Sequence, residues 1–151
     1  MVTNEQASIQ RMIANRRMHG IFDQAKAGHP APFYETRQIF LDCRGQLSIH
    51  PNTGWGWFAA VITTSHDTVS GETMYGENMS KVVDRPVTVD DGAYIGSFAI
   101  LYNCHIKHHA VVACGAVVRN KTVEPYTVVE GNPAKPVKVF ENGKWVKIEQ
   151  S

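Results

Sequence analysis

One histidine in this chain stands where a regular sequence pattern stops. His66 lies in the segment Thr63-Thr64-Ser65-His66-Asp67, and residues 63–82 are polar and show no period. An imidazole with a pKa of about 6.5 can take a proton from a hydroxyl group at neutral pH. Asp67 could orient that ring or bind the hydroxyl groups of an acceptor. The alternative is a surface histidine in an ordinary Asx or Ser/Thr turn.

Three further histidines, His105, His108 and His109, lie close together and raise the question of a metal site. Zinc requires several ligands that converge on one point. Adjacent positions on a tightly coiled chain face different ways, so these side chains are not expected to converge. We therefore expect no metal.

An apolar residue returns almost every six residues between positions 83 and 118, in steps of six, six, five, six, six and six. A helix repeats near 3.6 residues and a half-buried strand repeats at 2, so neither alone explains a period near six. That period, with short strands and small inner partners, is typical of a triangular parallel β-helix. The series is Val83, Val89, Ile95, Ile100, Ile106, Val112 and Val118, and its preceding partners are Val87, Ala93, Cys104, Ala110 and Ala116.

The same rhythm is present, but weaker, between residues 39 and 62. Ile49, Trp55 and Val61 share one frame, although Trp55 is bulky for an inner position. Aliphatic side chains stacked in this way fill a narrow prism, which leaves no room for a ligand inside. Any chemistry is therefore expected outside the coils, on loops or between subunits.

The two ends of the chain depart from this pattern. Residues 3–27 predict a helix, with Thr3 as N-cap and Gln6 completing a capping box. We expect a helical cap over 1–30, a β-helix over 31–140 with a long loop at 63–82, and a tail with a hairpin over 141–151.

Composition excludes several classes of function. The 151 residues are 43% hydrophobic, which suits one domain with a real core, and the net charge of +1 argues against nucleic acid as a partner. No apolar run approaches the roughly 18 residues that would span a bilayer, so no membrane partner is expected. The first residues do not resemble a secretion signal, and the three cysteines form no CxxC pair. We expect a cytoplasmic protein.

Four stretches resemble a known family. They are residues 95–118 with their Ile95-Gly96 opening, the run Ala-Val-Val-Ala-Cys-Gly-Ala-Val-Val over 110–118 within them, Pro125–Lys135 with its Gly-Asn-Pro-Ala-Lys ending, and Ile62–Asp67. Together they resemble the hexapeptide-repeat acyltransferases with a left-handed parallel β-helix. The nearest branch looks like the small sugar O-acetyltransferases related to maltose and galactoside acetyltransferases.

This resemblance implies a homotrimer with active sites between subunits and acetyl-coenzyme A as co-substrate. His66 matches the position of the family's catalytic histidine and would act as general base toward a sugar or glycan hydroxyl. Small residues would let the coenzyme approach the later coils, and basic residues would attract its phosphates. The expected cofactor-binding residues are Ala113, Gly115, Ala116, Arg119, Lys121 and Lys135. Tight coil turns and a solvated basic face would explain the same residues without a ligand.

Two other functions stay open from the sequence. An amino sugar, free or linked to a nucleotide, would need a base of the same kind, so N-acetylation is one alternative. The other is a β-helix without catalysis that serves as a binding or assembly module. Several positions where the family usually has a coil glycine carry another residue, such as Lys107 after Ile106. The segment 119–125 is also one residue longer than the commoner form. Both departures keep that alternative open.

Overall fold

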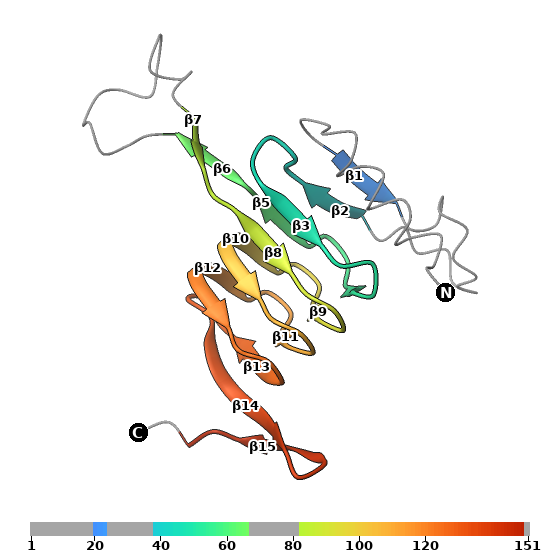
Figure 1. Ribbon diagram of the computed structural model, residues 1–151, viewed down its shortest axis with the longest axis vertical. Coiled ribbons are helices and arrows are strands. Elements are labelled where there is room, and N and C mark those ends of the chain that lie inside the picture. Colours follow the sequence, from blue (N-terminus) through green and yellow to red (C-terminus); the bar gives the residue numbers. More distant parts are fainter. Residues whose placement is uncertain (1–19, 24–37, 67–81, 150–151) are drawn as a thin grey trace.

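The structure is a computed structural model that describes residues 20–23, 38–66 and 82–149. These residues form short strands that wind around a three-sided prism (Figure 1). The strands are β1 (Gly20–Asp23), β2 (Gln38–Leu41), β3 (Leu47–Ile49), β4 (Gly54–Trp55), β5 (Ala60–Ile62), β6 (Thr64–His66), β7 (Val82–Asp84), β8 (Val87–Val89), β9 (Tyr94–Ile95), β10 (Ile100–Ile106), β11 (Val111–Val112), β12 (Val117–Val123), β13 (Thr127–Glu130), β14 (Lys135–Glu141) and β15 (Lys144–Lys147).

Parallel pairing between successive coils builds the three faces of the prism. The first face contains β2, β5 and the first halves of β10 and β12. The second face contains β3, β8 and the second halves of β10 and β12, and the third contains β4, β9, β11 and β13. This is the expected left-handed parallel β-helix.

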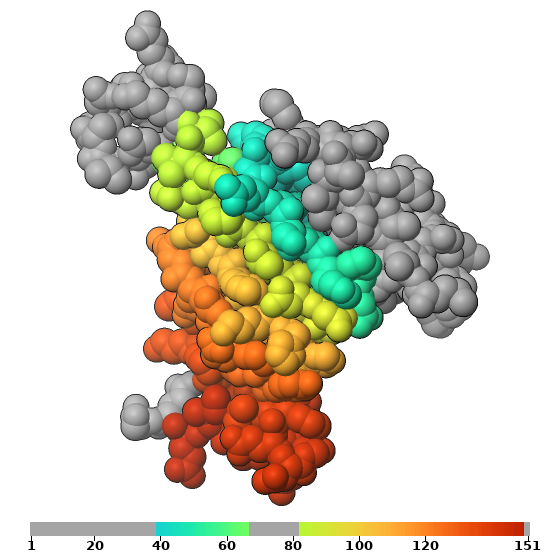
Figure 2. All heavy atoms as spheres, in the orientation of Figure 1, coloured from blue at the N-terminus to red at the C-terminus, as the bar shows by residue number. Residues whose placement is uncertain are grey.

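The core consists of rungs in which equivalent residues of successive coils stack. Each fully buried aliphatic side chain contributes about 1.5–3 kcal/mol relative to exposure, so these rungs account for much of the stability. Figure 2 shows the coils as bands of colour packed directly against one another. The inner residues are Leu41, Val61, Leu101 and Val118 on the first face, Ile49, Val89, Ile106 and Val123 on the second, and Trp55, Ile95, Val112 and Val129 on the third.

Two predicted inner residues lie elsewhere. Val83 belongs to β7 and lies opposite Ser65 in a separate two-stranded sheet, not on a face of the prism. Leu101 is 0% exposed and occupies the inner position, whereas Ile100, the predicted residue, is 39% exposed on the outside. The short step therefore lies between Leu101 and Ile106, not before Ile100. A second five-residue step, from Val118 to Val123, falls at the same corner one coil later. The cause is a one-residue turn between the first and second faces, which the apolar pattern alone does not locate.

That corner is built in two ways along the prism. In the last two coils it is a single asparagine with positive φ, Asn103 at 45° and Asn120 at 53°. The Asn103 Nδ2 group donates to Asn120 Oδ1 at 2.8 Å, so the two side chains form a short ladder. We call this the narrow corner.

In the first two coils the same corner is much longer. It consists of residues 42–46 and of the base of an excursion, residues 63–66 and 82–86, which we call the wide corner. Strands β6 and β7 pair antiparallel in the excursion and project from the prism (Figure 1). The expected loop thus begins and ends as a pair of strands.

The expected helix over residues 3–27 does not include residues 20–23, which form strand β1. β1 pairs antiparallel with β2, whose outer edge would otherwise leave unpaired backbone groups. The remainder of the predicted helix lies outside the described residues. At the other end, the terminal hairpin begins at Lys135, earlier than expected, and β14 continues the third face antiparallel to β13. Within the described ranges, we find no helix long and apolar enough to cross a membrane.

Candidate functional site

His66 is the last residue of β6, opposite Val82 of β7. Its ring is partly buried, and the Nδ1 atom is shielded from solvent without a hydrogen-bond partner. A shielded imidazole nitrogen with no partner is costly in a purely structural role, which favours a role in binding or proton transfer. Asp67, the predicted partner of this ring, lies outside the described residues, and its role stays a prediction.

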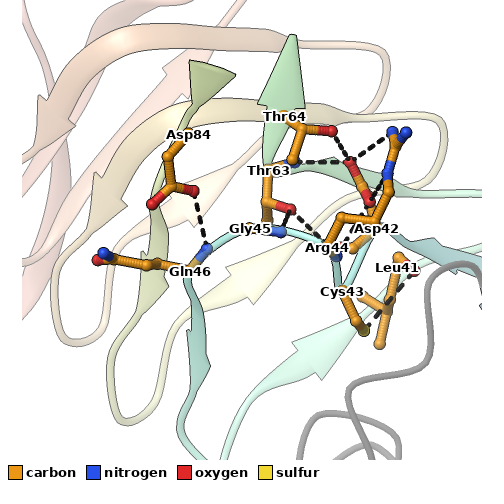
Figure 3. Close-up of polar contacts among 9 residues, drawn as sticks. All are labelled: Leu41, Asp42, Cys43, Arg44, Gly45, Gln46, Thr63, Thr64 and Asp84. Carbon is orange, nitrogen blue, oxygen red and sulfur yellow. Dashed lines mark hydrogen bonds and ion pairs between the residues drawn. The ribbon is translucent and has the colours of Figure 1, made fainter. Parts of the chain in front are cut away.

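A buried carboxylate lies beneath the strand that carries His66. Asp42 is 0% exposed, and Arg44 pairs with it through Nε to Oδ1 at 2.8 Å and Nη2 to Oδ2 at 3.1 Å. Two groups at the start of β6 bind the same carboxylate: Thr64 Oγ1 donates to Oδ2 at 2.7 Å and the Thr63 amide at 3.3 Å (Figure 3). The first coil is thereby joined to the root of the excursion.

The charge of Asp42 is stabilised by these partners. Burial opposes its ionisation, but hydrogen bonds from Arg44 and Thr64 and the charge of Arg44 outweigh burial and lower its pKa to about 2. Asp42 is therefore ionised at neutral pH, and it is a structural anion that cannot serve as a base.

Further bonds tie both strands of the excursion to residues 42–46. The Gly45 amide donates to Thr63 Oγ1 at 3.0 Å, and the Gln46 amide donates to Asp84 Oδ1 at 3.0 Å. The Arg85 amide donates to the Thr63 carbonyl at 2.7 Å. A Cβ on Gly45 would come within 2.3 Å of the Thr63 carbonyl oxygen, so only glycine fits this approach.

The opposite side of the excursion faces a tyrosine and two arginines. Side chains alternate along a strand, so Ser65 points away from Thr64 and His66. Arg85 Nε donates to the Tyr102 hydroxyl at 2.8 Å, and Arg119 pairs with Tyr102 in register on the next coil. Burial opposes ionisation of Tyr102, but contact with Ser65 and Arg85 and the two guanidinium charges outweigh it, so its pKa is lowered.

The six expected cofactor-binding residues lie at two different corners. Arg119 and Lys121 flank the narrow corner, and Lys121 Nζ is bonded to the Ala134 carbonyl beside the exposed Lys135. The small residues lie at the corner between the third and first faces. There, Ala116 is fully buried in the core, while Gly115 is exposed with a φ of 69°.

The amide groups at that corner are already occupied. The amides of Ala113, Gly115 and Ala116 donate to carbonyls of Val129, Ser97 and Ala113. A ligand passing this corner could approach the open space at Gly115, where a Cβ would meet nothing within 4 Å, but it could not bind these three amides.

The histidine cluster is not arranged as a metal site. His105 Nε2 lies 2.7 Å from Asp90 Oδ2, while His109 stacks on Tyr126 and His108 meets that tyrosine edge-on. Within the part of the chain that the structure describes, no group of three or more His, Cys, Asp or Glu side chains could hold a metal ion.

Sequence reasoning missed Asp42, Arg85 and Tyr102. The only local signal was an acidic residue directly after the apolar run Ile39-Phe40-Leu41, which puts a carboxylate next to the core. Such a position suggests a buried, paired charge. The sequence does not say what pairs with it.

The known proteins that resemble this chain, and that are described below, are all acyltransferases or acetyltransferases. No protein-family model matches the chain. Over 81 residues, 53% of this chain, it is 32% identical to acyl-[acyl-carrier-protein]–UDP-N-acetylglucosamine O-acyltransferase of Alkalilimnicola ehrlichii, of which it covers 31%.

Two solved structures share the fold. A maltose O-acetyltransferase of Clostridium difficile 630 is 26% identical with a TM-score of 0.54, over 64% of this chain and 49% of that one. A hexapeptide-repeat acetyltransferase of Vibrio cholerae O1 biovar eltor, complexed with acetyl-coenzyme A, is 18% identical with a TM-score of 0.54, over 93% and 88%. The chain spans about half or less of the first two proteins. In fold and sequence it resembles the hexapeptide-repeat acyltransferases, maltose O-acetyltransferase among them.

Proposed function

We propose that this protein transfers an acetyl group from acetyl-coenzyme A to a hydroxyl of a sugar or glycan precursor, with His66 as general base. The observation that carries the proposal is the position of His66: it ends a strand outside the filled prism, with Nδ1 unpartnered, two residues after Thr64, whose hydroxyl bonds to the buried Asp42. The named activities of two similar proteins, both O-acyl transfers to sugars, support the acceptor class.

In the proposed reaction the acceptor oxygen attacks the thioester carbonyl while an imidazole nitrogen of His66 takes the hydroxyl proton. A carbon–oxygen bond forms and a tetrahedral oxyanion results. Its collapse breaks the carbon–sulfur bond, and the imidazolium returns its proton to the departing thiolate. A positioned base of this kind contributes about 10²–10⁴-fold to the rate.

The separation of the two corners supports a site shared between copies. His66 lies at the wide corner, and Ala113 and Gly115 lie at the far edge of the first face. A coenzyme in a groove between two β-helices could touch the small corner of one copy and the histidine of another, with Arg119 and Lys135 near its phosphates.

Exposed apolar side chains beside that face support lateral association. Phe58 and Phe98 stack at 5.4 Å and are 46% and 62% exposed, next to the outward Ile100. We therefore propose a homotrimer. A cytoplasmic location stays a prediction from the sequence.

An acceptor screen with acetyl-coenzyme A and mass detection tests the function. His66→Asn should lower kcat by about 10²–10⁴-fold, whereas His50→Asn, which changes an exposed histidine at another corner, should not. Amine acceptors in the same screen test N-acetylation. Full activity of His66→Asn would remove the proposed base, and no binding of acetyl-coenzyme A in titration calorimetry would favour the non-catalytic module.

A further inference from the structure

We infer that Asp42 is a positioning residue: its buried carboxylate fixes the root of β6 and thereby the place of the His66 ring. The inference rests on the proposed function, because it assigns Asp42 a role in that same site. Asp42 itself is 0% exposed, so it contacts neither substrate and acts only through β6.

Both oxygens of the carboxylate are engaged. Oδ1 accepts from Arg44 Nε at 2.8 Å and from the Arg44 amide at 3.2 Å. Oδ2 accepts from Arg44 Nη2, from Thr64 Oγ1 and from the Thr63 amide. A bidentate guanidinium fixes the plane of the carboxylate, so the two threonine groups meet an acceptor whose orientation is set in advance.

The link from this carboxylate to the ring is short. Thr64 and His66 lie on the same side of β6, two residues apart, which is about 7 Å along a strand. The hydrogen bond from Thr64 Oγ1 fixes the side chain of that residue, and the bond from the Thr63 amide fixes the backbone before it. Together they set the direction in which β6 leaves the prism.

β6 needs this support because its sheet gives little. In the described part of the chain it pairs with β7 alone, in a two-stranded sheet. An isolated pair of strands is marginally stable in water. Strands of the prism are held by neighbours above and below and by inward side chains. For β6, the bonds to Asp42 take that place.

The bonds to β7 have a different role. The Gln46 amide holds Asp84, and the Arg85 amide holds the Thr63 carbonyl, so the two strands are anchored at their base. These contacts keep the hairpin attached to the prism. The bond between Asp42 and Thr64 Oγ1, by contrast, is made by β6 itself, on the side of the strand on which His66 lies.

Misplacing a catalytic group by about 1 Å can cost up to about 10²-fold in rate. We expect Asp42→Asn, which keeps the shape but loses the charge and one acceptor, to lower kcat about 10–100-fold with little change in KM for acetyl-coenzyme A. Thr64→Val should lower kcat by a similar factor, and Thr64→Ser should restore it because it keeps the hydroxyl. Asp91→Asn is the matched control, because Asp91 accepts a hydrogen bond from Asn52 at another corner.

A double-mutant cycle with His66→Asn separates positioning from general damage. If Asp42 acts through His66, adding Asp42→Asn to His66→Asn lowers the residual rate no further. In parallel, hydrogen exchange of the full chain should show faster exchange at residues 64–66 in Asp42→Asn and Thr64→Val, with the prism strands unchanged.

The outcomes are distinguishable. Full activity of His66→Asn alone would overturn the proposed function, while the hydrogen-exchange result would still show whether Asp42 fixes the root of β6. A normal kcat in both Asp42→Asn and Thr64→Val, unchanged exchange at residues 64–66, or a further loss of rate in the double variant would each overturn the positioning role.

Discussion

The narrow and wide corners connect the same two faces of the prism but are stabilised differently. At the narrow corner each coil turns on one asparagine, and the side chains of Asn103 and Asn120 bond to each other at 2.8 Å. At the wide corner the chain leaves the coil, so identical residues of successive coils no longer stack on one another there. The place of that stacking is taken by an ion pair between the buried Asp42 and the exposed Arg44, and the carboxylate also accepts hydrogen bonds from the root of the excursion.

This difference shows where the fold leaves room for chemistry. A one-residue turn repeats itself from coil to coil and exposes little that could be specialised. An excursion can carry a histidine away from the filled interior, but its base must then satisfy backbone groups that the sheet no longer pairs. A network around one buried carboxylate does this, and it depends on every member being bonded.

The largest expected effect on stability is overcrowding at the wide corner. In Gly45→Ala the new methyl group would meet the Thr63 carbonyl oxygen at 2.3 Å and Asp84 Oδ1 at 2.5 Å. We expect a loss of about 3 kcal/mol in the free energy of unfolding, measured with urea. Gly115→Ala is the control: its φ is 69° but the space is open, so about 1 kcal/mol is expected. Equal losses would show that the corner can relax.

Acid should weaken the wide corner next. The pKa of Asp42 is lowered to about 2 in the folded protein, below its value in the unfolded chain. The lowered pKa of Asp42 therefore adds about 2 kcal/mol to the free energy of unfolding. This contribution is complete above a pH of about 4 and is lost as the pH falls toward 2. Urea unfolding of the protein and of Asp42→Asn at pH 6, 4 and 3 checks this. The two stability curves should converge in acid, and parallel curves would contradict the prediction.

The narrow corner should be less sensitive. Asn120→Ala removes the bond from Asn103 and places alanine at a φ of 53°, so we expect a loss of about 1–2 kcal/mol. Asn120→Gly loses the same bond but relieves the backbone and should cost less. Asn142→Ala changes a residue with a φ of 50° in the β14–β15 turn, so its effect in thermal melts measures the cost of placing alanine at positive φ. If Asn120→Ala cost no more than Asn142→Ala, the ladder would contribute nothing.

The rates at which the cysteines react compare the two corners in the protein without any substitution. Burial raises the pKa of Cys104, beside the narrow corner, to about 12, and burial and the charge of Asp42 raise the pKa of Cys43 in the wide corner. A disulfide reagent at pH 8 should modify the exposed Cys114 first. Cys43 should follow before Cys104, because we expect the wide corner, at the base of a two-stranded sheet, to open more readily than the prism. Mass spectrometry over time gives the order, and Cys104 reacting before Cys43 would be the contrary result.

Much of the prism was predictable because its pattern is local. The inner residues Ile49, Trp55 and Val61 follow the predicted frame, and the buried indole N–H of Trp55 is satisfied by a hydrogen bond from Nε1 to Thr53 Oγ1 at 2.9 Å. Ile100 was misplaced because the pattern shows that a step is short without showing which corner shortens it. Leu101, one residue on, satisfies the same apolar rule.

The candidate site was predictable only in part. His66 could be singled out as a base because it stands where the rhythm ends. The bonds of Asp42 to Thr63 and Thr64, at the start of the strand that carries His66, could not be predicted, since these residues are far apart in the sequence and meet only in the folded coils. The same holds for Tyr102 with Arg85 and Arg119.

By itself, the sequence determined that a filled three-sided prism forms, because repeated burial of aliphatic side chains is a property of spacing and type. It also determined that the histidine would stand outside that prism. Only the tertiary structure decided which corner turns on one residue and which opens. It also decided which charge is buried beneath β6. Those outcomes depend on the register between coils, which hydrogen bonds between distant residues set.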